Sequence, residues 1–317
     1  MFSNNNIVDI LIKSSESAAL SCTKFVGNGD GKKCDHLAVE AMRSELSKAD
    51  FKMKIVIGEG ERDEAPMLYI GEELGSLESK VIYDIAVDPL EGTNLCANGL
   101  PNSITSIVAS KQGSLLFAPD VYMAKIATGI NLPNGDIDLD MDIVEIIKNI
   151  AKFLKISIED VKVLILERDR HLDIIDKIRK CGAKAILFSD GDILATIKAM
   201  NYQQTGCHLY IGTGGAPEGV ISSVSVNTVG GFMQGRLISN DEKQIARAKT
   251  MGIADFNKKY SSKELSSEGA IFVATGVTDG DILDAPKFYQ DKVITNSIIF
   301  NSQNKTVLKI YNTRYCV

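Results

Sequence analysis

The chain has 317 residues and a mass of 34.4 kDa, enough for one large or two medium-sized domains. Hydrophobic residues make up 44% and charged residues 24% of the chain, which excludes a disordered or fibrous protein. The net charge of −6 argues against a protein that binds nucleic acid by neutralising its phosphates. Aromatic residues amount to only 6% without any Trp, so platforms for stacking bases are also poorly supplied.

Membrane and secretory signals are missing from the sequence. No apolar run reaches the roughly 20 residues that a membrane helix needs, and the first 13 residues lack the basic start of a signal peptide. The six cysteines form neither a CxxC pair nor a zinc pattern: Cys22, Cys34, Cys96, Cys181, Cys207 and Cys316. We therefore expect a cytoplasmic protein with reduced, mostly buried thiols and no membrane partner.

The first part of the chain predicts a mixture of helices and strands. Apolar residues at helical spacing predict helices over 6–25 and 34–48. Short apolar runs predict buried strands over 54–57 and 81–87, the second ending at Asp88-Pro89 because proline restricts the residue before it. Further strands are expected as a hairpin of 104–110 with 115–118, and then at 122–128 as a continuation of the same sheet.

From about residue 140, predicted strands alternate with predicted helices, which indicates crossover units and a largely parallel sheet. These elements are expected at 143–153, 161–166, 172–180, 183–188, 193–200, 207–211 and from 219 onward. Strands at 271–275, 292–299 and 305–312 are expected to return to the first sheet. We therefore predict an α/β protein with two sheet regions: a metal-binding region over 1–140, completed by strands from 265–317, and a second region over 141–264.

Acidic side chains gather where predicted strands end and helices begin: Asp35, Glu59 with Asp63, Asp88 with Glu91, Asp190 with Asp192, and Glu218. In open α/β sheets, ligands bind at the carboxyl ends of strands. Asp88 and Glu91 stand three apart around a turn, so both can reach one cation. Hard oxygen ligands without histidine suit Mg²⁺ or Mn²⁺. The alternative is a solvated acidic turn. Glu59 and Asp63, which follow another predicted strand, argue against this alternative.

Two segments are candidates for binding a phosphate. The run 212–219 is a glycine-rich strand-to-helix turn whose backbone N–H groups can hold an anion, although it is neither a Walker loop nor GxGxxG. Arg168-Asp169-Arg170 follows a predicted strand and offers positive charge. Asp190 and Asp192 could accept hydrogen bonds from sugar hydroxyls. Each segment has an alternative without a ligand. The run 212–219 could be a plain tight connection, residues 168–170 a solvated basic helix start, and residues 190–192 a simple turn.

Several of these segments resemble the class II fructose-1,6-bisphosphatases of the GlpX type. The resemblance is carried by residues 57–72, 86–93, 214–219 and 233–237, and extends to 16–20 and 251–253. The first segment is long and specific. The run 88–93 is shared more widely, with the lithium-sensitive sugar and inositol phosphatases. The resemblance thus covers nearly the whole chain.

This resemblance implies a layered sugar-phosphatase fold and hydrolysis of the 1-phosphate of fructose 1,6-bisphosphate in gluconeogenesis, with Mn²⁺ or Mg²⁺ as cofactor. The positions that match the family's metal ligands are Asp35, Glu59, Asp88, Glu91 and Glu218. Those that match substrate contacts are Glu91, Gly92, Thr93, Tyr122, Arg168, Asp169, Arg170, Asp190, Gly191, Asp192 and Gly215. By analogy with the superfamily, Thr93 and Asp63 would activate the attacking water. We also expect a homo-oligomer.

The sequence departs from the family pattern at two places. The family usually has Gly-Asp-Lys before the first metal aspartate, whereas this chain has Gly29-Asp30-Gly31 followed by Lys32 and Lys33. It also has Arg168-Asp-Arg-His where the family often shows Lys-Pro-Arg-His. These departures bear on substrate preference. The alternatives are a related phosphatase for sedoheptulose 1,7-bisphosphate or inositol phosphate, and a non-catalytic protein that binds a sugar phosphate or a divalent ion.

Overall fold

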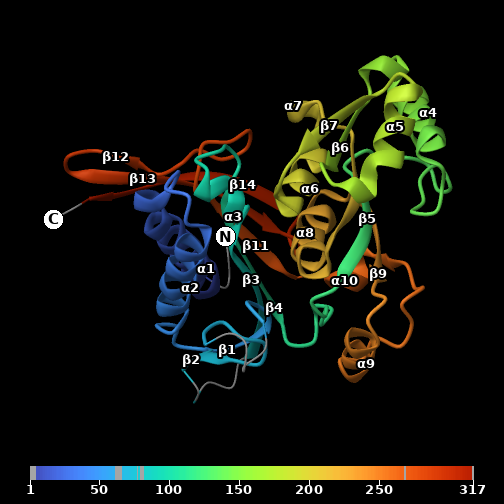
Figure 1. Ribbon diagram of the computed structural model, residues 1–317. Helices are drawn as coiled ribbons and strands as arrows, with labels where there is room; N and C mark the ends of the chain where they lie inside the picture. Colours follow the sequence, from blue (N-terminus) through green and yellow to red (C-terminus); the bar gives the residue numbers. More distant parts are fainter. Residues whose placement is uncertain (1–4, 61–65, 77, 79–81, 268, 316–317) are drawn as a thin grey trace. The chain divides into compact units, whose positions relative to one another are not determined.

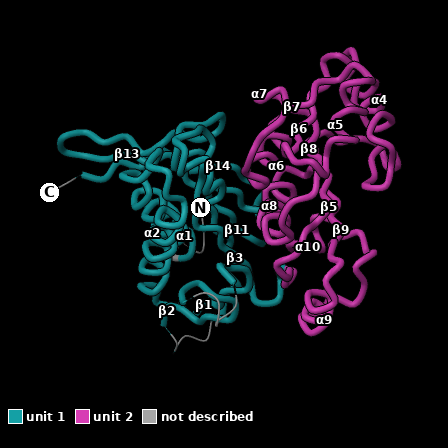
Figure 2. Tube along the Cα trace, in the orientation of Figure 1, with its two compact units in different colours: residues 1–115, 268–317 teal, residues 116–267 magenta. Residues whose placement is uncertain are grey.

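The computed structural model describes residues 5–60, 66–76, 78, 82–267 and 269–315, which divide into two compact units (Figure 2). Unit 1 comprises residues 1–115 and 268–317, and unit 2 comprises residues 116–267. Each unit has its own sheet, so the predicted α/β class with two sheet regions is confirmed. The boundary predicted near residue 140 lies inside unit 2.

Unit 1 is built on an eight-stranded sheet with the order β12-β13-β11-β4-β3-β1-β2, and β14 pairs with β13. Its strands are β1 (Lys52–Ile57), β2 (Glu73–Gly75), β3 (Ile82–Glu91), β4 (Ile104–Lys111), β11 (Ile271–Gly276), β12 (Lys287–Phe288), β13 (Lys292–Asn301) and β14 (Thr306–Tyr315). The predicted hairpin of 104–110 with 115–118 is wrong. β4 instead lies between β3 and β11, antiparallel to both, so its partner comes from far along the chain.

Helices α1 (Asn5–Cys22) and α2 (Gly31–Leu46) lie side by side on the sheet of unit 1 (Figure 1). The short η1 (Thr23–Phe25) and α3 (Thr93–Ala97) complete the helices of this unit. α2 begins where the Asp30 side chain accepts a hydrogen bond from the Lys33 backbone N–H at 3.0 Å. Apolar side chains from both long helices and from the central strands form one core, so the segment that carries Asp35 is fixed against the sheet.

The strand predicted to end at Asp88-Pro89 in fact continues to Glu91 as β3. Its pairing with β4 shifts register between Asp88 and Glu91: Asp88 is opposite Ser106 and Glu91 is opposite Ile104. Three steps on β3 therefore span two on β4, which is a β-bulge. A residue at a bulge makes no ladder hydrogen bond, so the missing N–H of Pro89 costs none there. The strand therefore continues through Pro89 and carries both acids at its end.

Unit 2 is built on a six-stranded sheet with the order β10-β9-β5-β8-β6-β7. Its strands are β5 (Tyr122–Thr128), β6 (Lys162–Leu166), β7 (Lys184–Phe188), β8 (Leu209–Gly215), β9 (Phe232–Ile238) and β10 (Tyr260–Ser261). The expectation of a largely parallel sheet is wrong: among the described pairs, β6 is parallel to β7 and β8, whereas β5 and β9 add antiparallel strands. β5 also belongs to this sheet and not to the first one.

Helices cover both faces of the unit 2 sheet. They are α4 (Ile143–Leu154), η2 (Ile158–Asp160), η3 (Asp169–His171), α5 (Leu172–Lys180), α6 (Asp192–Met200), α7 (Tyr202–Thr205), α8 (Ala216–Val229), α9 (Glu242–Thr250) and α10 (Ser262–Leu265). Isoleucines of α4 and α5 share a core with one face of β5, β6 and β8. α6 and α8 pack on the same strands from the other side (Figure 1). Functional side chains at the strand ends are thus held by a three-layer unit.

None of the helices in the described part of the chain is long and apolar enough to cross a membrane. The structure describes five of the six cysteines: Cys22, Cys34, Cys96, Cys181 and Cys207. All of them except Cys181 are buried, in agreement with the prediction of mostly buried thiols.

Candidate active site

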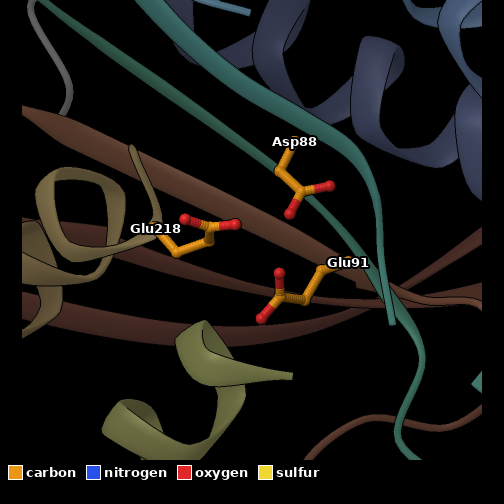
Figure 3. A group of neighbouring side chains, drawn as sticks. All are labelled: Asp88, Glu91 and Glu218. Carbon is orange, nitrogen blue, oxygen red and sulfur yellow. The ribbon is translucent and has the colours of Figure 1, made fainter. Parts of the chain in front are cut away.

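The predicted acids of unit 1 converge on the ends of its central strands. Glu59 follows β1, Asp88 and Glu91 lie at the end of β3, and Asp35 comes from the second turn of α2. Carboxylate oxygens of Asp88 and Glu91 lie within 4.8 Å of each other, and both side chains extend from the strand in Figure 3. Asp88 is also tied to the turn, since its Oδ1 accepts a hydrogen bond from the Leu90 N–H at 3.2 Å.

The electrostatics of these acids show that they act on one another. Burial, and next the negative charge of Asp88, raise the pKa of Asp35 from 3.8 to about 6. Burial, followed by the charges of Asp35 and Asp88, raises the pKa of Glu59 from 4.5 to about 8. Such shifts arise when carboxylates are crowded away from water. We call Asp35, Glu59, Asp88 and Glu91 the unit 1 acid cluster.

The unit 1 acid cluster fits a hard divalent cation. Its donors are carboxylate oxygens, which Mg²⁺ and Mn²⁺ prefer. Burial and mutual repulsion raise the pKa values of Asp35 and Glu59, and a bound cation would offset both, as expected for a set of metal ligands. The predicted divalent-metal dependence is thus supported by the donor set, whereas the choice between Mn²⁺ and Mg²⁺ stays a prediction.

Thr93 lies directly after these acids, at the first position of α3. Its hydroxyl donates a hydrogen bond to the Leu90 carbonyl at 3.0 Å. The helix N-cap is Gly92, which has a left-handed backbone with φ of 78° and makes no side-chain capping bond. Gly92, and not Thr93, is therefore the N-cap of α3. Its predicted partner Asp63 lies outside the described residues.

In unit 2, the glycine-rich segment forms the end of β8 and the start of α8. The strand extends to Gly215 and the helix begins at Ala216, so no separate turn intervenes. Glu218 stands in the first turn of α8, where a negative charge interacts favourably with the helix dipole (Figure 3). A Cβ atom at Gly215 would lie 1.9 Å from Glu218 Oε2, so only glycine allows this carboxylate to fold back over the strand end.

Arg170 and Tyr122 meet at the same end of the unit 2 sheet. Arg170 donates hydrogen bonds from Nε and Nη2 to the Thr213 carbonyl, at 3.0 and 2.6 Å. Its guanidinium lies 4.9 Å from the centre of the Tyr122 ring. Tyr122 in turn pairs with Gly215 across β5 and β8. The structure thus brings three of the predicted substrate contacts together, with the aromatic ring exposed.

Asp190 and Asp192 follow β7, but their environments differ. Asp190 Oδ1 accepts a hydrogen bond from the Gly191 N–H at 3.1 Å. Asp192 is buried at the start of α6, where its Oδ2 forms an ion pair with Lys125 Nζ at 2.6 Å. Lys125 was not among the predicted site residues. Alternation along β5 places this lysine on the same side of the strand as Met123 and Ala127. A charged residue between two apolar ones on that side was the sequence signal that could have identified Lys125.

The remaining predicted contacts surround η3. Arg168 is half-buried and donates from Nη1 to the Glu167 carbonyl at 2.9 Å, and Asp169 is exposed. His171, the last residue of η3, is buried and stabilises the fold. Its Nδ1 is 2.8 Å from the Leu166 carbonyl, and its Nε2 accepts a hydrogen bond from the Thr213 N–H at 2.8 Å. His171 therefore joins η3 to β8 and holds Arg170 near Thr213.

Comparison with known proteins shows the family to which the chain belongs. The family model described as bacterial fructose-1,6-bisphosphatase, glpX-encoded, matches residues 5–314. The chain belongs to this family. The predicted enzyme class, a phosphoric monoester hydrolase acting on fructose 1,6-bisphosphate, is confirmed by that membership.

Individual relatives are similar over nearly their whole length. A protein of Prochlorococcus marinus strain MIT 9312, named D-fructose 1,6-bisphosphatase class 2/sedoheptulose 1,7-bisphosphatase, is 42% identical over 96% of this chain and 94% of its own. A protein of the same name from Synechococcus strain JA-2-3B'a(2-13) is 40% identical over 94% of this chain and 92% of its own. The solved structure of the extragenic suppressor protein suhB from Bartonella henselae is 16% identical, covers 63% of this chain and 72% of its own, and has a TM-score of 0.35.

Proposed function

We propose that this phosphatase removes the 1-phosphate of fructose 1,6-bisphosphate over the unit 1 acid cluster, while unit 2 binds the rest of the substrate. The observation that carries this proposal is the burial of Glu59 beside the charges of Asp35 and Asp88, which together raise its pKa to about 8. In a phosphatase family, crowded carboxylates at strand ends serve to hold the cations that face the scissile phosphate.

Asp35, Glu59, Asp88 and Glu91 would hold the divalent cation, with Glu218 of unit 2 as a further ligand. When bound, Mn²⁺ or Mg²⁺ would neutralise phosphate oxygens and stabilise the charge of the transition state. The bulge at Pro89 supports this role, since it presents Asp88 and Glu91 together at the end of β3. The burial of Glu91 also suits a ligand better than a solvated surface acid.

Thr93 and Asp63 would orient the attacking water and take its proton. The Thr93 hydroxyl donates to the Leu90 carbonyl at 3.0 Å, which fixes the position of its oxygen beside the acid cluster. That oxygen can still accept a hydrogen bond from water. For Asp63 to receive the hydroxyl proton, the O–H must rotate away from Leu90, which costs one weak bond. This pairing rests on analogy with the superfamily.

Unit 2 would bind the sugar and the phosphate that does not react. Arg168, Arg170 and the backbone at Gly215 would hold this phosphate, and Asp169 is a further candidate contact. Arg170 uses Nε and Nη2 on Thr213, and its other N–H groups can donate to an anion. Tyr122, Asp190, Gly191 and Asp192 would contact the sugar, and Gly92 with Glu91 and Thr93 would contact it from unit 1.

A second substrate, sedoheptulose 1,7-bisphosphate, is favoured by the double name of the relatives that are about 40% identical. Both compounds carry a phosphate at carbon 1 of a ketose, so the same cation site serves both. We place the reaction in gluconeogenesis in the cytoplasm, and we expect a homo-oligomer.

A phosphate-release assay tests the proposal. The purified chain is given fructose 1,6-bisphosphate, sedoheptulose 1,7-bisphosphate or inositol 1-phosphate, with Mn²⁺ or Mg²⁺ and then with excess EDTA. We expect release from the two ketose bisphosphates, loss of activity in EDTA, and recovery when the cation is added back. Asp88→Asn should abolish activity without lowering the melting temperature. Full turnover in EDTA would contradict the metal mechanism, and release from inositol 1-phosphate alone would contradict the substrate.

A further inference from the structure

Lys125 occupies an unusual position for a lysine. It lies in the middle of β5, paired with Gly212 of β8 and Gly235 of β9, and only 1% of its side chain is exposed. Its Nζ donates hydrogen bonds to Asp192 Oδ2 at 2.6 Å and to the Gly215 carbonyl at 2.8 Å. A single ammonium group therefore links the start of α6 to the end of β8.

Burying such a pair is costly. Desolvation of two charges offsets most of their attraction, and well-packed apolar residues of the same volume are often as stable. The fold also leaves almost no spare room around the pair: a Cβ atom at Gly214 would lie 1.7 Å from Asp192 Oδ2. Stability alone therefore does not explain an ion pair at this place.

The second oxygen of Asp192 indicates what the pair is for. Asp192 is 7% exposed, and its Oδ1 has no hydrogen-bond partner among the described residues. A buried carboxylate oxygen without a donor is unfavourable, so the site is incomplete without a ligand that donates a hydrogen bond. Gly214, at the end of β8, lies against this carboxylate. The next residue, Gly215, pairs with Tyr122, and the Arg170 guanidinium lies over the Tyr122 ring. Asp192 thus lies at the same sheet end as these proposed substrate contacts.

We propose that Lys125 is a positioning residue: it holds Oδ2 of Asp192 so that Oδ1 accepts a hydrogen bond from a hydroxyl group of the sugar bisphosphate. This inference rests on the proposed function and adds to it a residue that does not touch the substrate. Lys125 also holds the Gly215 carbonyl, so the Asp192 carboxylate and the strand end before Glu218 are fixed by the same group.

The test compares three variants with the wild-type chain: Lys125→Met, Asp192→Asn and the double variant. Lys125→Met leaves a buried carboxylate without its partner, so we expect a lower melting temperature. We expect its KM for fructose 1,6-bisphosphate to rise about 10- to 100-fold with kcat nearly unchanged, because the hydroxyl contact exists before and during the reaction. In the double variant no charge is buried, so the melting temperature should return toward the wild-type value.

The KM values of these variants separate positioning from a merely structural role. If Lys125 positions Asp192 for the substrate, Lys125→Met raises KM although the Asp192 carboxylate is still present, and the double variant has the same KM as Asp192→Asn. If Lys125 serves the fold alone, the KM of Lys125→Met stays at the wild-type value while its melting temperature falls, and the inference is overturned. Should Lys125→Met fail to fold, Lys125→Arg takes its place, because it keeps a buried cation but moves the donor group, and an unchanged KM in that variant overturns the inference.

Lys177→Met is the matched control. Lys177 pairs with Asp142 at 2.7 Å, a similar distance, but both side chains are about half exposed. This variant should keep both KM and melting temperature. The proposed function is tested separately, by wild-type hydrolysis of fructose 1,6-bisphosphate. An active wild type with an unchanged KM in Lys125→Met would reject the Lys125 inference alone.

Discussion

His171 Nε2 accepts a hydrogen bond from the backbone N–H of Thr213 at 2.8 Å, while Nδ1 lies 2.8 Å from the Leu166 carbonyl. An imidazole that accepts at one nitrogen and donates at the other is neutral. Burial is the main cause that lowers the pKa of His171 below its ordinary 6.5, and the charge of Arg170 lowers it further. The same His171 ring thus positions the strand end that Arg170 contacts.

A stability prediction follows from the neutral His171. Below pH 6.5 the unfolded chain binds a proton at this histidine that the folded chain does not, so the free energy of unfolding falls as the pH is lowered from about 6.5. We expect His171→Gln to show a smaller loss between pH 7 and pH 5 in urea unfolding. An unchanged slope in His171→Gln would show that other groups cause the acid loss.

The unit 1 acid cluster predicts the opposite pH dependence in the metal-free protein. The pKa of Glu59 is raised from 4.5 to about 8, so the folded chain keeps a proton that the unfolded chain has lost in this range. Stability in EDTA should therefore fall as the pH rises from about 4.5 to about 8, because the unfolded state binds fewer protons there. Melting temperatures in EDTA across this range measure the effect, and added Mn²⁺ should reverse it at pH 8.

Glu59→Gln is the variant that isolates this effect. It removes the titrating group, so the fall between pH 6 and pH 8 in EDTA should become shallower, and the metal-free variant should melt at a higher temperature than the wild type at pH 8. Glu145→Gln, at an exposed acid on α4, is the control and should leave the slope unchanged. A wild-type slope in Glu59→Gln would exclude Glu59 from the cluster.

The local sequence pattern predicts part of the fold and leaves other parts out. Helices α1 and α2 and the strands β1, β6 and β7 follow from the local pattern of apolar residues. The pairing of β4 with β11 does not, since 160 or more residues separate the partners, which no local pattern encodes. β9 was missed although its residues alternate between partly and fully buried, because Gly235 interrupts the apolar pattern.

The candidate site likewise has parts that the sequence predicts and parts that it does not. Acids after strands were visible as a pattern, and the structure brings Asp35, Glu59 and Asp88 close enough to shift one another's pKa values. Lys125 and Asp192 are 67 residues apart, so their ion pair depends on how β5 and α6 pack. The bulge at Pro89 could not be anticipated either, since it depends on the register with β4.

Arg170→Ala should mainly raise KM. Its guanidinium lies over Tyr122 and is bonded to the Thr213 carbonyl, in a place suited to the phosphate that does not react. A contact of this kind exists in the ground state and in the transition state alike, so kcat should change little. Steady-state kinetics with fructose 1,6-bisphosphate measure this, with the exposed Arg179→Ala on α5 as control. A large fall in kcat at constant KM would place Arg170 at the scissile phosphate instead.

Thr93 is tested by separating its hydroxyl from its methyl group. The hydroxyl donates to the Leu90 carbonyl, and the Cγ2 methyl lies so close to Gly31 that a Cβ there would be 2.9 Å away. Thr93→Val keeps the methyl and the shape but removes the hydroxyl. If the hydroxyl orients the attacking water, kcat should fall by roughly 10²- to 10⁴-fold while the substrate still binds.

Thr93→Ser is the complementary variant, because it keeps the hydroxyl and loses the methyl. We expect it to retain substantial activity, with a lower melting temperature from the lost packing against Gly31. Since Gly92 is the N-cap of α3, loss of a cap cannot account for any effect of Thr93→Val. Its only structural cost is the bond to Leu90, worth about 1 kcal/mol. A Val variant that is destabilised by this amount yet turns over at the wild-type rate would remove Thr93 from the chemistry and leave the water to be oriented by other groups.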